Sequence, residues 1–203
     1  MRYLRKKRIV PNTWKEFKIK DCFDTSSGAT PLSTDKSYYE DGDIPWINSG
    51  ELSLPYICET KNFISQKGFV NSSTQILPID TVLVAMYGAT AGKASLLKMK
   101  ACTNQAICAI LPNEEYDSTF IKYSIDTLYD YLVSLSTGSA RDNLSQAIIR
   151  DLKIITPQSF AEQQKLSYVL SLIDKKILLN KTINHNLPTL DRSSRGVEVR
   201  HAA

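Results

Sequence analysis

The sequence has few of the side chains that bind metals or form disulfide bonds. Of its 203 residues only two are histidines and four are cysteines, and no two cysteines stand in a C-x-x-C pair. These counts argue against a zinc site and against a disulfide framework, so we expect reduced cysteines in a cytoplasmic protein. No apolar run is long enough to cross a membrane. No apolar segment follows the basic N-terminus, which argues against a secretory signal.

Basic residues concentrate at the two ends of the chain. The first eight residues carry five of the 25 lysines and arginines, and the segment after Leu190 carries three more together with two of the 21 acidic residues. Residues 9–190 therefore hold 17 basic and 19 acidic residues, so bulk charge alone does not indicate a nucleic-acid partner. An anionic partner would have to bind local clusters of basic residues and the basic arm of residues 1–11. The alternative for this arm is a solvated, disordered terminus.

The chain is organised around the stretch Leu77–Pro112. Two apolar runs, Thr81–Met86 and Ala106–Leu111, are typical of buried strands, and a hydrophobic fraction of 42% allows them a proper core. They bracket a small-residue turn, Gly88–Lys93, whose glycines can adopt backbone angles closed to other residues. A nucleotide-binding P-loop requires G-x-x-x-x-G-K-[ST], whereas here three residues separate the glycines and Ala94 follows the lysine. We therefore expect a tight loop whose backbone lies close to something polar or anionic.

Patterns before and after this stretch predict further elements. A strand is expected where apolar and charged residues alternate or a short apolar run occurs, a loop where Gly, Ser, Thr and Pro gather, and a helix where apolar residues recur three and four apart. By these rules we predict strands over Trp14–Lys20, Ile44–Ile47 and Leu152–Ile155, loops over Thr25–Pro31 and Thr137–Leu144, one helix over Ser118–Ser134, and a helical turn over Ser145–Ile149.

Beyond Ser159 the pattern becomes that of a long helix. From Phe160 about 28 residues precede Pro188, which stops a helix, and at 1.5 Å per residue they would span roughly 40 Å. Apolar and asparagine side chains recur at alternating intervals of four and three, the a/d pattern of a coiled coil: Leu166, Leu170, Ile173, Ile177, Asn180, Asn184 and Leu187. Such a helix exposes too much apolar surface to stand alone, so we expect a partner helix. The alternative is a helix packed back onto its own domain.

Eight short motifs, each loose by itself, follow one another in a distinctive order. They are Trp14–Phe23, Ser27–Pro31, Gly42–Ile47, Leu77–Ala85, Gly88–Lys93, Asn104–Ala106, Gly138–Ser145 and Pro157–Gln164. In this order they resemble one half of the DNA-specificity subunit of type I restriction–modification systems. The resemblance covers about residues 12–187.

This resemblance implies an α/β (α+β) globular target-recognition domain, residues 12–157, that reads one half of a bipartite DNA site. It also implies a long C-terminal α-helix, residues 158–188, that forms an antiparallel coiled coil with a second such helix. We expect residues 189–203 to be a disordered tail or a cloning remnant. Full subunits of the family carry two recognition domains and two spacer helices. One copy of each makes a homodimer the expected assembly, whether the chain is a natural half-subunit, a truncated product or an engineered fragment.

The family also implies a non-catalytic role. Modification (methyltransferase) subunits, joined in some systems by a restriction subunit, would supply the chemistry. S-adenosylmethionine is then expected only on the methyltransferase, and this chain should need no cofactor and no metal. The residues agree with that expectation, since we find no nucleophile arrangement, no paired histidines and no methylase or nucleotide fingerprint. The alternatives are an independent enzyme, and an assembly or decoy protein that pairs through its helix without reading sequence.

DNA contacts are expected from loop residues. For phosphates we select Lys93, the backbone amides of Gly88–Gly92, Arg141 and Lys36. For base edges, which specify sequence through paired donors and acceptors, we select Asn48, Ser49, Tyr87, Thr90, Asn104 and Gln105. Alternatives stay open: Asn104 and Gln105 can satisfy backbone groups at a strand start, and Arg141 can pair with Asp142.

Overall fold

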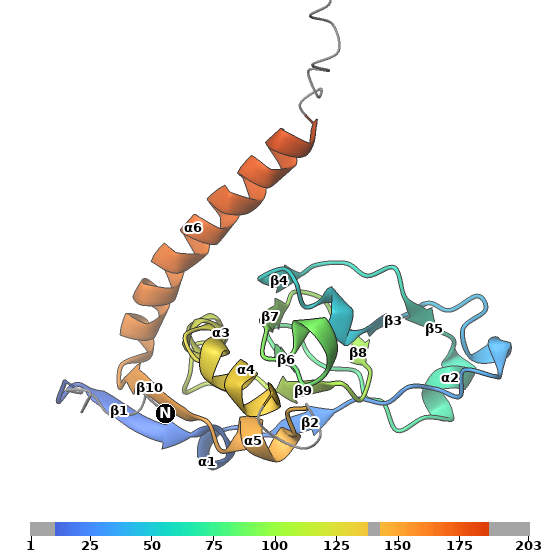
Figure 1. Cartoon of the computed structure of the whole chain (residues 1–203), viewed down its shortest axis with the longest axis horizontal. Coiled ribbons are helices and arrows are strands. Elements are labelled where there is room, and N and C mark those ends of the chain that lie inside the picture. The colour runs from blue at the N-terminus through green and yellow to red at the C-terminus, as the bar shows by residue number, and fades with distance from the viewer. Residues whose placement is uncertain (1–10, 138–142, 187–203) are drawn as a thin grey trace, which may run out of the picture.

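The structure, a computed structural model, describes residues 11–137 and 143–186. A two-stranded clasp, β1 with β10, lies at one end of the molecule, a central sheet in the middle, and a small lobe with α2 at the other end (Figure 1). The long helix α6 leaves from the clasp and extends away from the domain (Figure 1). No described helix is long and apolar enough to cross a membrane.

The strands form three sheets within the described residues. The five-stranded sheet has the order β2-β9-β6-β7-β4, the small lobe has β5-β3-β8, and the clasp has β1-β10. Their bounds are β1 Trp14–Lys18, β2 Thr25–Ser27, β3 Ile44–Ile47, β4 Tyr56–Ile57, β5 Phe63–Ile64, β6 Val82–Ala85, β7 Ala94–Leu97, β8 Cys102–Thr103, β9 Ile107–Ile110 and β10 Lys153–Pro157.

Helices cover these sheets and join them. The α-helices are α1 Ile19–Cys22, α2 Gln66–Val70, α3 Ser118–Asp126, α4 Tyr129–Thr137, α5 Gln146–Arg150 and α6 Phe160–Asn186. Single 3-10 turns are η1 Lys36–Tyr38, η2 Ser49–Glu51 and η3 Gly88–Thr90. Four of these begin at a side chain that accepts a backbone N–H, as an N-cap does: Asp35, Ser65, Asp117 and Ser145.

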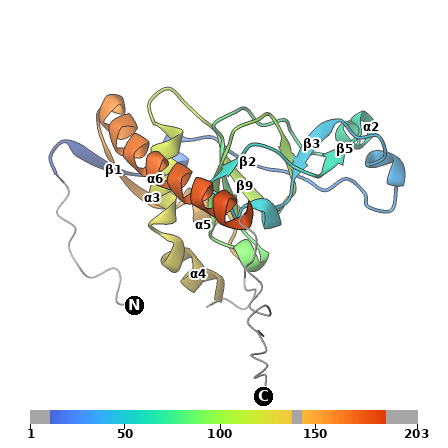
Figure 2. The same ribbon diagram turned by 90° about the horizontal axis from the view of Figure 1, so that it is seen from above.

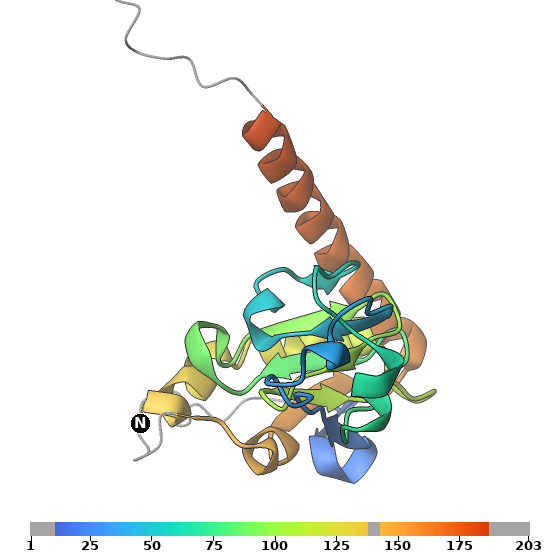
Figure 3. The ribbon, with the colours of Figure 1, turned by 90° about the vertical axis from the view of Figure 1, so that its right-hand side faces the viewer.

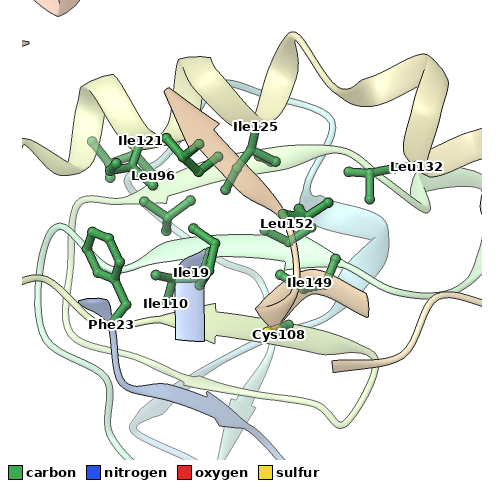
Figure 4. Packing of buried hydrophobic residues seen from close by; sticks show 14 of the residues in the cluster. Ile19, Phe23, Leu96, Cys108, Ile110, Ile121, Ile125, Leu132, Ile149 and Leu152 are labelled. Atoms are coloured by element: carbon green, nitrogen blue, oxygen red, sulfur yellow. The ribbon is translucent and has the colours of Figure 1, made fainter. Parts of the chain in front are cut away.

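The central sheet is buried on both faces, because alternate residues of a strand point in opposite directions. On β6, Val82 and Val84 face one hydrophobic core, whereas Leu83 and Ala85 face another. The first core packs α1, α3 and α5 against the sheet (Figure 4). Cys108 lies in this core, and burial raises the pKa of its thiol to about 12. Cys108 is thus a small residue of the core.

Several predicted elements are confirmed. The two apolar runs form β6 and β9, which pair antiparallel. The strands predicted over Trp14–Lys20 and Leu152–Ile155 form as β1 and β10, which pair with each other in full register, but Ile19 and Lys20 belong to α1. This clasp joins the two ends of the domain, because it places the start of the described chain beside the strand that leads into α6.

Five of the ten described strands were not predicted: β2, β4, β5, β7 and β8. Ala94–Leu97 forms β7 directly after the glycine turn, so the turn joins β6 to β7 and does not join β6 to β9. Thr25–Ser27 was predicted as loop but forms β2 at the sheet edge, where its backbone pairs with the buried strand β9. The loop prediction for Thr25–Ser27 was wrong, and β7 was missed, because these segments lack β-branched apolar character and their strand state follows from pairing with a buried neighbour.

The single helix predicted over Ser118–Ser134 was also wrong, since the chain forms α3 and α4 with a break at Thr127. The Thr127 hydroxyl donates to the Ser124 carbonyl oxygen at 2.7 Å, and Leu128 N–H donates to the Ile125 carbonyl at 2.8 Å, which closes the first helix early. The break changes the direction of the chain. Leu132 on α4 can then be fully buried beside Gly92, in the same core as α3.

Candidate nucleic-acid interface and pairing helix

Loops that are far apart in the sequence meet at one end of the central sheet. Gly28 lies so close to β8 that a Cβ added there would fall 1.8 Å from the Thr103 carbonyl oxygen. Ala29 N–H donates to the same oxygen at 3.0 Å, and the indole of Trp46 donates to the Ala29 carbonyl at 3.0 Å. The structure therefore brings together two of the motifs that carry the family resemblance, Ser27–Pro31 and Gly42–Ile47, beside the residue that precedes a third, Asn104–Ala106.

Asn48 and Asn104 form the centre of this meeting point. The Asn104 Nδ2 donates to Asn48 Oδ1 at 3.2 Å, and Asn104 Oδ1 accepts the Ala106 N–H at 3.1 Å. Asn104 thus supports a turn before β9, as the structural alternative predicted. Both residues are only half-buried, so their amides border the surface.

Gln105 is more accessible than its neighbour. Its side chain is exposed, and its Oε1 accepts a hydrogen bond from the Thr30 hydroxyl at 2.5 Å. Ser27 Oγ donates to the Gln105 and Ile107 carbonyl oxygens at 3.3 and 3.2 Å. These contacts fix the backbone of Gln105 and orient its amide, which is the condition for reading a base edge with few rotamers to lose.

The glycine turn packs against η2, beside Asn48. The Thr90 hydroxyl donates to the Ser49 carbonyl at 2.8 Å, and Thr90 is 8% exposed. Thr90 therefore anchors the turn, so its hydroxyl is not available to a base, which corrects its predicted role. Gly88 has φ +78°, the left-handed region that glycine favours. Gly88 and Tyr87 are exposed at the tip of the turn.

The remaining predicted contacts do not all join this cluster. Lys93 is half-buried at the other end of the turn and lines a shallow cavity with Leu54 and Tyr129. Lys36 is exposed on η1 in the small lobe. Arg141 lies outside the described residues. We name the surface formed by Asn48, Ser49, Tyr87, Gly88, Asn104 and Gln105 the loop face.

Sequence reasoning missed the residue that organises this face. The two carboxylate oxygens of Glu51 accept from Asn48 N–H at 2.8 Å, from the Thr60 hydroxyl at 2.8 Å and from Asn62 Nδ2 at 3.0 Å. A glutamate three residues after an asparagine is the spacing of a capping box. That spacing was a usable signal, whereas Thr60 and Asn62 are joined only by tertiary structure.

The helix α6 has two distinct surfaces. A polar stripe contacts the domain and is buried, with Gln163 at 0%, Ser167 at 3% and Ser171 at 9% exposure. The predicted a/d side chains lie roughly a quarter of a turn away at 100° per residue. Leu166, Leu170, Ile173 and Ile177 are 39% to 52% exposed. Asn180 and Asn184 are also exposed, and Leu187 lies outside the described residues.

Most of the apolar surface of α6 is thus left uncovered. Its first half passes over α3 (Figure 2), and its second half rises clear of the domain (Figure 3). Between α6 and β4 runs a groove of about 1250 Å³, lined by Tyr56, Ile57, Tyr168 and Lys175 among others. The helix therefore packs against its own domain along the polar stripe, and the alternative in which it folds back onto the domain does not account for its apolar side.

Comparison with known proteins identifies the family. The sequence model of the family described as "Type I restriction modification DNA specificity domain" matches residues 11–189. The chain belongs to this family. The expected fold of this specificity domain, a mixed α/β domain followed by a long C-terminal helix, agrees with solved relatives.

Individual relatives of the specificity domain are longer. The specificity subunit of the type I restriction enzyme MjaIX of Methanocaldococcus jannaschii is 32% identical over 183 residues, which are 88% of this chain and 42% of that protein. The EcoR124I/EcoR124II specificity subunit of Escherichia coli is 24% identical over 166 residues, covering 79% and 40%. The solved S subunit of a type I restriction–modification system from M. genitalium matches with a TM-score of 0.65 at 17% identity, covering 84% and 41%. The chain spans about two fifths of each relative.

Proposed function

We propose that this specificity domain reads one half of a bipartite DNA site and directs methyltransferase subunits, and in some systems restriction subunits, to it. The chain itself would be non-catalytic. S-adenosylmethionine would bind only the methyltransferase. Among the described residues no group of histidine, cysteine and carboxylate side chains is placed to hold a metal ion.

The observation that carries the proposal is the uncovered apolar side of α6 on a domain of this family. Exposed apolar patches of this kind mark interaction surfaces, and the a/d spacing of the exposed side chains suits a second helix. Two copies paired antiparallel through α6 would place a recognition domain at each end of a rod of roughly 40 Å. One turn of DNA separates equivalent groove faces by about 34–36 Å, so both domains would reach the same side of a duplex.

Within this arrangement the loop face is the candidate DNA-reading surface. Asn48, Asn104 and Gln105 offer the amides that suit adenine edges, and each such pair contributes about 1–3 kcal/mol of discrimination. Lys93 and Lys36 lie apart from the face and would contact phosphates, which only fix the register of the protein on the duplex.

Selection of binding sites from a random DNA pool tests the proposal. The purified chain is mixed with its methyltransferase subunit, and the bound sequences are determined. We expect two inverted half-sites separated by a gap of fixed length. Random bound sequences would instead support an assembly or decoy protein. Methylation by the chain alone would show an enzyme and overturn the non-catalytic role.

A further inference from the structure

The direction in which α6 leaves the domain depends on two contact points. The first is Gln163, whose Oε1 accepts Asp117 N–H at 2.9 Å and whose Nε2 donates to the Pro157 carbonyl at 3.0 Å. These bonds tie the first turn of the helix to the start of α3 and the end of β10. A rod fixed only at its first turn can still pivot, so a second contact must set its angle.

Asp174 provides the second contact, eleven residues or about 16 Å farther along the helix. Its Oδ2 accepts the Tyr123 hydroxyl at 2.7 Å and lies 3.6 Å from Lys122 Nζ. The Tyr123 hydroxyl is also hydrogen-bonded to the Tyr56 hydroxyl, at 3.1 Å. Lys122 Nζ also pairs with Asp126 at 2.8 Å and lies 4.3 Å from the centre of the Tyr123 ring. We name Tyr56, Lys122, Tyr123, Asp126 and Asp174 the root network.

The contacts between these two points are less directional: Leu170 borders a cavity with Phe120 and Tyr123 and remains 41% exposed. Ser167 and Ser171 face the domain, but their hydroxyls donate to carbonyls of their own helix, at 3.1 and 2.7 Å. Small side chains of this kind do not interlock with α3 as large apolar side chains do. Gln163 and the root network therefore supply the directional contacts that set the angle.

The root network is costly to bury, which argues for a specific role. The Lys122 side chain is 4% exposed, and a buried charge is tolerated only when it is paired. Burial, ahead of the hydrogen bonds from Tyr56 and to Asp174, raises the pKa of Tyr123 far above its usual range, so its hydroxyl stays a donor to Asp174. A well-packed apolar contact would stabilise the fold at least as well, but it would not fix one geometry.

A small change in the angle of α6 displaces its far end by a distance that matters on DNA. A tilt of about 10° at Gln163 moves the far end of a 40 Å helix by roughly 7 Å. Successive base pairs rise by about 3.4 Å, so the same tilt shifts a domain at that end by about two base pairs.

We propose that the root network sets the length of the gap between the two half-sites, with Tyr123 and Asp174 as positioning residues. This inference rests on the proposed function, because it requires the paired helices. It goes beyond that function by assigning gap length to side chains at the base of the helix, in addition to the length of the helix itself.

The test repeats the site selection with Tyr123→Phe and Asp174→Asn. Their matched controls are Tyr131→Phe and Asp130→Asn, at exposed positions of α4. We expect unchanged half-site sequences but a gap that shifts or broadens by at least one base pair in the two root variants only. An unchanged, sharp gap in both would overturn the inference while leaving the proposed function intact. Absence of any split site with the unmodified chain would overturn the proposed function itself.

A distance measurement without DNA keeps the inference testable if a variant binds DNA poorly. Ser73 is exposed on the domain, and Cys58 is the exposed thiol among the described cysteines. A spin label at Ser73→Cys in a Cys58→Ser background reports the distance between the two domains of a dimer. We expect Tyr123→Phe, which removes one oxygen atom, to shift or widen this distance, whereas Tyr131→Phe does not. Identical distributions would overturn the inference.

Discussion

Gly28 shows how a single residue holds two distant motifs together. Its α-carbon lies against the Thr103 carbonyl, and any side chain there would meet backbone at 1.8 Å. The flexible end of a side chain can move aside, but a strand backbone cannot do so without loss of pairing. The requirement is therefore steric, and it lies beside the loop face.

We predict that Gly28→Ala lowers the free energy of unfolding of the domain by about 1–3 kcal/mol or more, because overpacking usually costs that amount. Urea denaturation measures this as a lower midpoint. The matched control is Gly50→Ala, where an added Cβ meets nothing within 4 Å. That control should stay within about 0.5 kcal/mol of the unmodified chain. Equal midpoints for the two variants would contradict the assigned contact.

Ion pairs of Asp151 with lysines in and beside the clasp make the stability of the domain depend on pH in acid. Its Oδ1 pairs with Lys20 at 2.8 Å and with Lys18 at 3.2 Å. The hydrogen bond from Lys20, followed by that from Lys18, lowers the pKa of this carboxyl below its ordinary value of 3.8. A folded-state pKa below the unfolded value contributes stability that is fully present above the unfolded pKa and is lost as pH falls through the folded one.

We therefore predict that Asp151→Asn flattens the fall in stability below pH 3.8. Because the pair is exposed, the effect at neutral pH should be small. Chemical denaturation at a series of pH values measures the slope. Asp43→Asn is the control, at an exposed position with no ion pair among the described residues. Parallel pH profiles for Asp151→Asn and the unmodified chain would count against the prediction.

At the scale of elements, α6 differs from an ordinary amphipathic helix. Such a helix turns its apolar stripe toward its own core, but α6 presents Gln163, Ser167 and Ser171 to the domain. Its leucines and isoleucines face outward. The a/d pattern therefore indicated the side of the helix that the domain leaves exposed, whereas the polar stripe that contacts the domain was not predicted.

The helix pair α3 and α4 shows a second limit of pattern reading. Apolar spacing continues across Thr127, so the sequence alone favours one helix. The fold nevertheless divides it at Thr127, and Ile121 on α3 and Leu132 on α4 are buried in the same core. Apolar periodicity indicates which side chains are buried, but it does not indicate where the chain changes direction.

At the scale of the whole molecule, the proposed pairing through α6 would decide whether two half-sites are read together. Ile173 is 52% exposed at the middle of the a/d stripe. We predict that Ile173→Lys weakens a homodimer at least tenfold, because burying each isoleucine contributes about 1.5–3 kcal/mol and each 1.4 kcal/mol changes affinity about tenfold. Light scattering over a dilution series measures the dissociation.

The matched control is Thr182→Lys, which places the same charge on an exposed position of α6 away from the stripe. It should leave the dimer unchanged. A monomeric unmodified chain at micromolar concentration, or equal dissociation of the two variants, would contradict pairing through this stripe.

The sequence by itself determined the buried strands β6 and β9, the clasp strands and the long helix. Each of these is a local pattern of apolar side chains: a continuous run in β6 and β9, an alternation or short run in the clasp strands, and an a/d repeat in the long helix. The order of the motifs was also enough to indicate the family. Most positions of the loop face were selected for the same reason, since loop residues with donor–acceptor side chains are visible one by one.

Only the tertiary structure decided which of those residues act together. Thr90 was selected for a base but anchors the turn on Ser49, and Glu51 was passed over although it organises the loop face. The root network joins three segments, at Tyr56, at Tyr123 and at Asp174. Hydrogen bonds between distant segments leave no period in the sequence, because they depend on where the chain has been brought by the packing of other residues.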